Sequence, residues 1–121
     1  YDIADCLRSG CNKSGEETKV VEDVSCDLSI VKEILRGYLT ANQESLKEGD
    51  STYLFEALRL ITFELGIRFF TDHLAGNVYF KTVEKHQNLN RAKVQFTLCE
   101  DIELKKNEIL AILKDLRKKQ E

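Results

Sequence analysis

The sequence predicts a mainly α-helical chain, and three observations carry this prediction. It contains no proline and only six glycines, which suits helices better than an all-β or linker-rich protein. Apolar residues recur at three- and four-residue spacing over residues 28–39 and 89–116. Between these stretches, residues 52–74 form a strongly apolar run. We therefore expect three main helices joined by short connections, with a short helical turn at the N-terminus.

The N-terminal part of the chain predicts a helical turn, a loop and the first main helix. Residues 1–11 mix apolar and charged residues in a way that fits a short helical turn. Residues 12–24 are polar and have no apolar period, so we expect an exposed loop there. Ser25 or Asp27 can cap the helix that follows, which we expect to end near Leu46.

The stretch 52–81, TYLFEALRLITFELGIRFFTDHLAGNVYFK, organises the rest of the chain. Its apolar residues lie nearly all the way round a helix, a pattern typical of a buried helix. Before it, Gly49 can supply a positive φ and Asp50 or Ser51 can act as the N-cap. The helix should stop at residues 75–77, where Gly and Asn tolerate the left-handed conformation, and a short extended apolar segment should follow.

Three charged residues share one stripe of that apolar helix. Glu64, Arg68 and Asp72 are spaced four apart, close enough for neighbours to pair. One interpretation is a self-satisfied ion network that ties the helix to its neighbours. The other is that Arg68 or Asp72 points into a polar cleft. We expect His73 to be packed or hydrogen-bonded, because no Cys or Ser is placed by the sequence to form a nucleophile pair with it.

The C-terminal part predicts one long helix over residues 88–119, with Asn88 as its cap. Its buried stripe would consist of Leu89, Ala92, Phe96, Cys99, Ile102, Ile109, Leu113 and Leu116. We expect this helix to pack along the body on one side. The alternative is that residues 102–116 extend past the body as a coiled-coil arm.

Composition limits the possible functions. With 121 residues, the chain is one helical domain or subdomain over residues 1–121. No apolar run approaches a membrane span, and the net charge of −3 with interleaved Lys and Arg offers no basic face for nucleic acid. We therefore expect no membrane and no nucleic-acid partner, and a cytoplasmic location. The absence of methionine predicts that the chain is a piece of a longer protein.

The four cysteines do not predict a metal or redox motif. Cys6, Cys11, Cys26 and Cys99 include no C-x-x-C pair, and the chain has only two His residues, so the spacing of a zinc or thioredoxin-type site is missing. Two disulfides are formally possible. Because no secretory segment is present, we expect four reduced thiols, with Cys99 as a small core residue.

Three strings in the second half of the chain resemble a known enzyme family: GIRFFTDHL (66–74), GNVYFK (76–81) and NLNRAKVQF (88–96). They look like the C-terminal end of aminoglycoside phosphotransferase-like enzymes, in the branch that includes the N-acetylhexosamine kinases. The resemblance runs over almost the whole chain and is strongest over residues 62–96. The chain departs from the family at Ala4, where Gly is usual, and at Gln87, where the family tends to have His.

The resemblance implies that the chain is a helical subdomain from the C-terminal lobe of a protein-kinase-like fold. The glycine-rich nucleotide loop, the catalytic Asp and the magnesium-binding Asp of such enzymes would lie upstream of Tyr1. The chain alone would then hold no catalytic, cofactor-binding or metal-binding residue and should not catalyse a reaction. ATP and magnesium are implied for the parent only, a phosphotransferase with an alcohol group as acceptor. The implied partners are the remainder of the parent chain and a sugar acceptor.

The resemblance assigns these residues a part in the acceptor pocket. In the sugar-kinase relatives, the Arg of the Gly-Ile-Arg motif and the Tyr of the Tyr-Phe-Lys motif are expected to face the sugar, and they correspond to Arg68 and Tyr79. Arg offers a rigid fork of donors, and Tyr offers an aromatic face with a hydroxyl. Asp72 is a further candidate that could instead orient Arg68, and Arg8 would lie close to the metal site of the parent. The alternative function is a noncatalytic helical protein-interaction module.

Overall fold

The computed structural model describes residues 2–42 and 49–119, and this part of the chain is helical almost throughout. The elements in order are α1 (Asp2–Gly10), a short 3-10 helix η1 (Val21–Asp23), α2 (Leu28–Asn42), α3 (Asp50–Leu74), α4 (Gln87–Leu104) and α5 (Lys106–Lys119). No strand occurs within these ranges, so the predicted mainly α class is confirmed. None of the described helices combines the length and the apolar character needed to cross a membrane.

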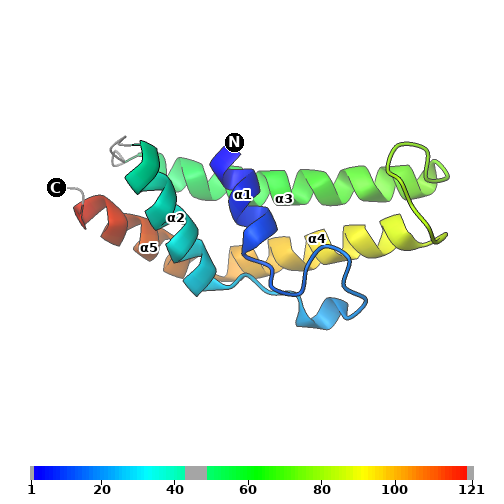
Figure 1. The fold of residues 1–121 in the computed structure, drawn as a ribbon, viewed down its shortest axis with the longest axis horizontal. Helices are drawn as coiled ribbons and strands as arrows, with labels where there is room; N and C mark the ends of the chain where they lie inside the picture. The colour runs from blue at the N-terminus through cyan, green and yellow to red at the C-terminus, as the bar shows by residue number, and fades with distance from the viewer. Residues whose placement is uncertain (1, 43–48, 120–121) are drawn as a thin grey trace.

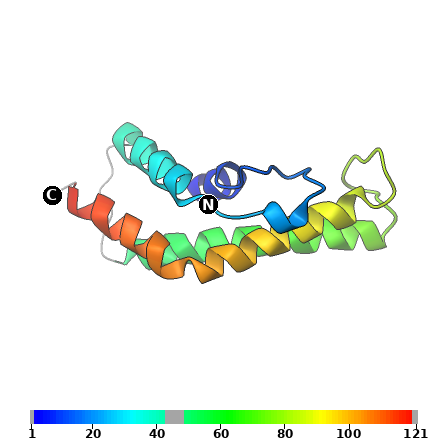
Figure 2. The ribbon, with the colours of Figure 1, turned by 90° about the horizontal axis from the view of Figure 1, so that it is seen from below.

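The helices α3 and α4 run antiparallel along the length of the molecule as a long hairpin (Figure 1). Seen from below, α1 and α2 lie on one face of this hairpin, and α5 continues beyond the end of α4 (Figure 2). The main core lies where these three helices meet the hairpin, and its largest buried side chains include Leu7, Val31, Leu35, Phe55, Leu58, Leu98, Ile102, Ile109 and Leu113. The other end of the hairpin carries the connection between α3 and α4, and the candidate site lies there.

The two hairpin helices approach closely at Gly66. A Cβ atom placed on Gly66 would lie 2.6 Å from Cε1 and 2.8 Å from Cδ1 of the Phe96 ring on α4. That ring also packs against Phe63, with the ring centroids 5.8 Å apart. Gly66 is therefore needed because its missing side chain lets the helices approach, and not for backbone freedom.

Replacing Gly66 with alanine should lower the free energy of unfolding by about 1–2 kcal/mol, because overpacking against Phe96 outweighs the roughly 1 kcal/mol gained from helix propensity. The matched control is Gly37→Ala in α2, where nothing lies within 4 Å of the added Cβ. This control should raise the free energy of unfolding by up to about 1 kcal/mol. Urea denaturation measures the free energy of unfolding of both variants. A higher value for both would show that the space next to Phe96 can accommodate an added methyl group.

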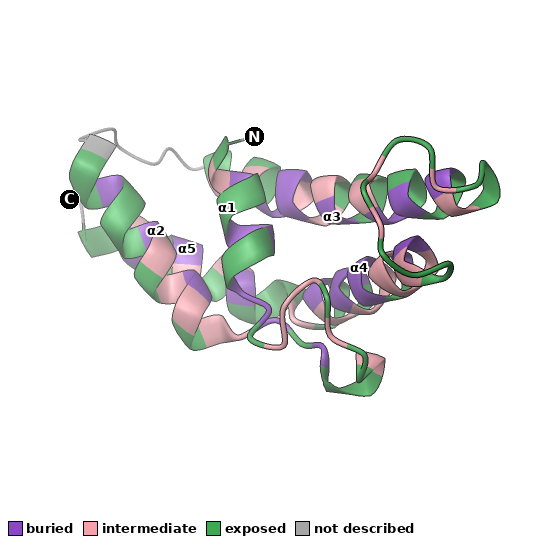
Figure 3. Ribbon diagram, turned by 45° about the vertical axis from the view of Figure 1, so that its right-hand side comes forward, coloured by how far each residue is buried: buried purple, intermediate pink, exposed green. Residues whose placement is uncertain are grey.

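One face of α3 remains exposed, which corrects the prediction of a helix buried nearly all round. The buried residues of α3 include Phe55, Leu58, Thr62, Gly66 and Phe69. On the other side, an outer stripe with exposed fractions from 40% to 71% consists of Leu60, Phe63, Ile67, Phe70 and Leu74. Exposed and buried segments alternate along α3 in Figure 3. The reason is geometric: in the described structure α4 and the helices beside it cover only one side of α3.

The C-terminal part is two helices, so the prediction of one helix over residues 88–119 is wrong. The helix is interrupted at Lys105, which has φ −97° and ψ 17°. Lys105 Nζ donates to the carbonyl of Cys26 at 2.7 Å and pairs with Asp101 at 2.7 Å, which fixes the break against the segment before α2. The change of direction lets α5 bury Ile109 and Leu113 in the main core. The helix therefore does not extend as a coiled-coil arm.

The predicted helix boundaries have mixed outcomes. Asp27 caps α2, since its Oδ1 accepts a backbone N–H at 3.1 Å. The stop after α3 is also confirmed, with φ of 91° at Gly76 and 63° at Asn77. By contrast, Gly49 has φ −77°, so the positive φ expected there is wrong. The predicted end of the helix at Leu46 falls outside the described residues.

The segment 12–24 connects α1 to α2 across the side of the hairpin, close to α4 (Figure 1). Most of its side chains are exposed or half-buried, but Asn12 and Val24 are buried at its two ends. The 3-10 helix η1 occupies its last third. The segment predicted as an exposed loop thus includes a short helix, and its two buried ends tie it to the body.

Candidate functional site

The connection after α3 is held in place by Asp72, in the last turn of that helix. Its carboxylate accepts the backbone N–H of Tyr79 at 2.7 Å and that of Phe80 at 2.9 Å. It also accepts the side-chain amide of Asn88, from the first turn of α4, at 2.8 Å. Asn88 donates in addition to Asn77 Oδ1 at 3.1 Å. One buried carboxylate thus joins the end of α3, the following connection and the start of α4.

These contacts stabilise the ionised form of Asp72. Its burial by itself raises the pKa of the carboxyl group. The backbone amides of Tyr79, Phe80 and Val78, together with the side chain of Asn88, outweigh that effect and lower the pKa below its ordinary value. The carboxylate is therefore ionised at neutral pH, as its acceptor role requires.

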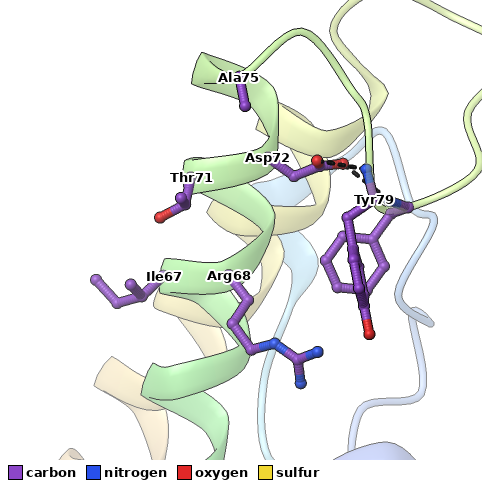
Figure 4. Close-up of a pocket in the computed structure, with 7 residues that line it drawn as sticks. Ile67, Arg68, Thr71, Asp72, Ala75 and Tyr79 are labelled. Atoms are coloured by element: carbon purple, nitrogen blue, oxygen red, sulfur yellow. Dashed lines mark hydrogen bonds between the residues drawn. The ribbon is translucent and has the colours of Figure 1, made fainter.

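The segment fixed by Asp72 brings Tyr79 opposite Arg68. The guanidinium carbon of Arg68 lies 5.7 Å from the centroid of the Tyr79 ring and 5.6 Å from that of Phe80. Phe80 in turn packs on Phe69 of α3, with centroids 4.6 Å apart. Figure 4 shows the side chains of Arg68 and Tyr79 on the same side of α3, below the segment that Asp72 holds. They share one open hollow, which is lined by Ile67, Arg68, Thr71, Asp72, Ala75, Tyr79 and Phe80.

The structure excludes one of the two interpretations of the charged stripe on α3, the ion network. Among the described residues, neither Glu64 nor Arg68 forms an ion pair, so the predicted self-satisfied network is absent. Asp72 does not contact Arg68 through a hydrogen bond either, and the suggestion that it orients Arg68 directly is wrong. It acts instead on the backbone that carries Tyr79. Arg68 is exposed and rests against aromatic rings.

Arg8, the fourth predicted site residue, lies in a neighbouring groove. Its buried guanidinium pairs with Asp5 at 2.8 Å and with Glu16 at 2.6 Å. Burial lowers the pKa of Arg8, but the two carboxylates outweigh this effect and raise it. The groove is shared with Arg68 and lies on the side of α3 that faces α1. Arg8 is thus close to Arg68 but does not line the hollow that contains Tyr79.

Two further residues that support the site were not predicted as such. Asn88 was expected to cap a helix, but it is fully buried inside the first turn of α4 and bonds Asp72. Arg91, one turn later, donates to Asn88 Oδ1 at 2.9 Å and to the carbonyl of Lys81 at 3.1 Å. It also pairs with Glu17. The i, i+3 spacing of Asn88 and Arg91 at a helix start was the available signal, but their partners are distant in sequence.

The two histidines do not form a recognisable chemical centre. His73 is half-buried, and its Nδ1 has no hydrogen-bond partner within the described structure. Its ring lies 5.6 Å from that of His86, centroid to centroid, at the end of the hairpin. The described residues contain no group of three or more His, Cys, Asp or Glu side chains that could hold a metal ion.

No protein-family model matches this sequence. The described residues define a helical chain with a long hairpin. At one end of this hairpin, an open hollow contains the guanidinium group of Arg68 and the exposed aromatic ring of Tyr79. The described residues also define an exposed apolar stripe along α3. Any function is best argued from these two features.

Proposed function

We propose that this chain supplies the acceptor-binding part of an ATP-dependent small-molecule kinase that acts on a hydroxyl group of an N-acetylhexosamine-like sugar. The observation that supports it most is the meeting of Arg68 and Tyr79 in one open hollow. The resemblance of the Gly-Ile-Arg and Tyr-Phe-Lys strings to sugar-kinase sequences points to the same two residues. The nucleotide-binding and catalytic residues are assigned to the remainder of a longer parent chain.

The chemistry of the hollow suits an uncharged polyhydroxylated ligand. The guanidinium of Arg68 forms no ion pair with the described residues, so its donors can bind hydroxyl or acetamide oxygens. Contact with two rings orients that fork without using its donors. Tyr79 is 74% exposed and offers both a flat apolar face and a hydroxyl group. Ile67 and Ala75 add apolar surface on which the methyl group of an acetamide can pack.

The outer stripe fits the same proposal. Phosphoryl transfer requires metal-bridged phosphates and a residue that orients the nucleophile, and the proposal places these on the rest of the parent. That part would also cover the outer stripe, because an apolar surface of this kind is rarely left open to water. Ile67 belongs to both the stripe and the hollow, so the covering part would complete the wall of the acceptor site.

In the intact parent enzyme, Arg68→Ala should raise the KM for an N-acetylhexosamine by about tenfold or more, because charge-assisted hydrogen bonds to the ligand are lost. Tyr79→Ala should act in the same direction. The controls are Arg36→Ala on α2 and Tyr53→Ala, since Tyr53 is equally exposed at 72% but lies at the far end of α3. Steady-state kinetics with varied sugar measure the effect. An unchanged KM in both site variants, with normal folding, would remove the assignment.

The alternative function, a noncatalytic helical interaction module, is favoured by the spacing of the outer stripe. Leu60, Phe63, Ile67, Phe70 and Leu74 follow the alternating three- and four-residue intervals of a coiled-coil seam. The matching occupant would be an amphipathic helix of another protein with the same spacing. The interaction surface would then be the stripe, and the hollow beside Tyr79 would have no ligand of its own.

The behaviour of the isolated chain separates the two functions. If the stripe is normally covered by the parent, the isolated chain should self-associate, and Leu60→Glu should restore a monomer in sedimentation analysis. The interaction module would be favoured if the chain stays monodisperse with its stripe intact and binds a helical peptide with heptad spacing. The Leu60→Glu variant should then no longer bind that peptide. Leu104→Glu is the matched control, because Leu104 is 80% exposed and lies outside the stripe.

A further inference from the structure

Two cysteines that are distant in sequence come together in the main core. Cys11 follows α1 and Cys26 precedes α2, and their exposed fractions are 0% and 1%. The backbone N–H of Asp27 donates to the carbonyl of Cys11 at 2.8 Å, which places the two chain segments side by side. Both cysteines belong to the same cluster of buried side chains, and both thiols are free in this structure.

The backbone around each cysteine is held by other contacts. The N–H of Cys11 bonds the carbonyl of Leu7 at 2.9 Å, at the end of α1. The N–H of Cys26 donates to Asp101 at 2.6 Å, and its carbonyl accepts from Lys105 at 2.7 Å. The bonds of Cys26 hold it against α4 and Lys105, and the bond from Asp27 to Cys11 keeps Cys11 beside it. The positions of the two cysteines are therefore held next to each other.

The two thiols differ in their acidity. A hydrogen bond with Cys11 lowers the pKa of Cys26, and although burial opposes this effect, the ammonium group of Lys105 adds to it. The same contact with Cys26, together with burial, raises the pKa of Cys11. Such an asymmetry suits thiol–disulfide exchange, in which one sulfur attacks as a thiolate and the other resolves the mixed disulfide.

We propose that Cys11 and Cys26 form a reversible disulfide that closes the 12–24 segment when the protein meets a low-molecular-weight disulfide such as oxidised glutathione. The Cys26 thiolate attacks one glutathione sulfur and releases one glutathione thiolate. Cys11 then loses its proton and attacks Cys26, which releases the second glutathione. Two protein thiols are oxidised, and one glutathione disulfide is reduced to two glutathione thiols. Because both sulfurs are buried, the segment must open for the first step.

The bond would act on the surroundings of the candidate site. The closed segment carries Glu16, which pairs with Arg8, and Glu17, which pairs with Arg91. Arg91 in turn bonds Asn88, the partner of Asp72. A covalent link at the base of this segment limits its opening and holds both glutamates against their arginines. This inference does not depend on the identity of the ligand in the hollow.

The test uses the native chain and the double variant Cys6→Ser with Cys99→Ala, which retains only the pair. After incubation with oxidised glutathione, both should lose the mass of two hydrogen atoms, give one peptide pair joined through Cys11 and Cys26, and melt about 10 °C higher. A reductant should reverse all three changes. The proposal would be overturned by stable glutathione adducts, by a link to Cys6 or Cys99, or by a bond that lowers the melting temperature. It would also be overturned if the backbone amides of residues 12–24 exchange with solvent, which shows that the segment opens, and yet no disulfide forms.

Discussion

Replacing Leu98 with alanine should lower the free energy of unfolding by roughly 2–5 kcal/mol, the range for deleting a buried leucine side chain in a packed core. Leu98 is 0% exposed and lies among core residues on α4. A domain of this size has a total stability of about 5–15 kcal/mol, so the variant should be partly unfolded at elevated temperature. Chemical denaturation followed by circular dichroism measures the change.

The matched control for this variant lies on the same helix. Leu104 is 80% exposed, so Leu104→Ala should change the free energy of unfolding by less than about 0.5 kcal/mol. The two substitutions remove the same atoms from α4, and only the surroundings differ. Equal losses at the two positions would mean that the packing of α4 in the core is not as described.

Replacing Asp72 with alanine should release the segment that carries Tyr79 and leave the rest of the hairpin folded. The variant removes the acceptor of two backbone N–H groups and leaves the buried amide of Asn88 with one partner fewer. Amide hydrogen exchange at Tyr79 and Phe80 should accelerate by about an order of magnitude or more. Asp115→Ala on α5 is the control, and full protection of both amides in Asp72→Ala would contradict the assignment.

The same carboxylate predicts how the site responds to acid. Because the pKa of Asp72 is lower in the folded chain than in the unfolded chain, its contribution is complete above the unfolded value of about 3.9. It is lost as the pH falls through the lower, folded pKa. Protection of the Tyr79 and Phe80 amides should therefore persist at pH 5 and fall in stronger acid. Asp72→Asn should remove this pH dependence, and an acid response that survives it would have another cause.

Local patterns in the sequence were sufficient where structure depends on neighbouring residues. The three- and four-residue spacing located the helices, and Asp27 and Gly76 mark helix ends because capping and positive φ act over one turn. The break at Lys105 could not be found in this way. It depends on contacts with Cys26, a residue far away in the sequence, and the apolar period continues across it.

The candidate site also combines features that the sequence predicted with contacts that it did not predict. The family resemblance of two short strings predicted that Arg68 and Tyr79 both face an acceptor, and the structure places the two side chains within cation–π distance of each other. The manner in which they are brought together was not predicted. Asp72 was expected to join an ion network, to line a pocket or to orient Arg68, whereas it bonds the backbone of the next segment. A side chain that satisfies backbone amides leaves no periodic signal, so only the folded chain reveals it.

By itself, the sequence determined that this protein is mainly helical, where α2 and α3 begin, where α3 ends, and which residue types are available for binding. These features follow from local propensity and apolar period. The tertiary structure alone decided which face of α3 is buried, because an apolar residue is equally apolar on either side of a helix. It also decided that Cys11 and Cys26 meet, since contacts between distant segments depend on how the helices pack.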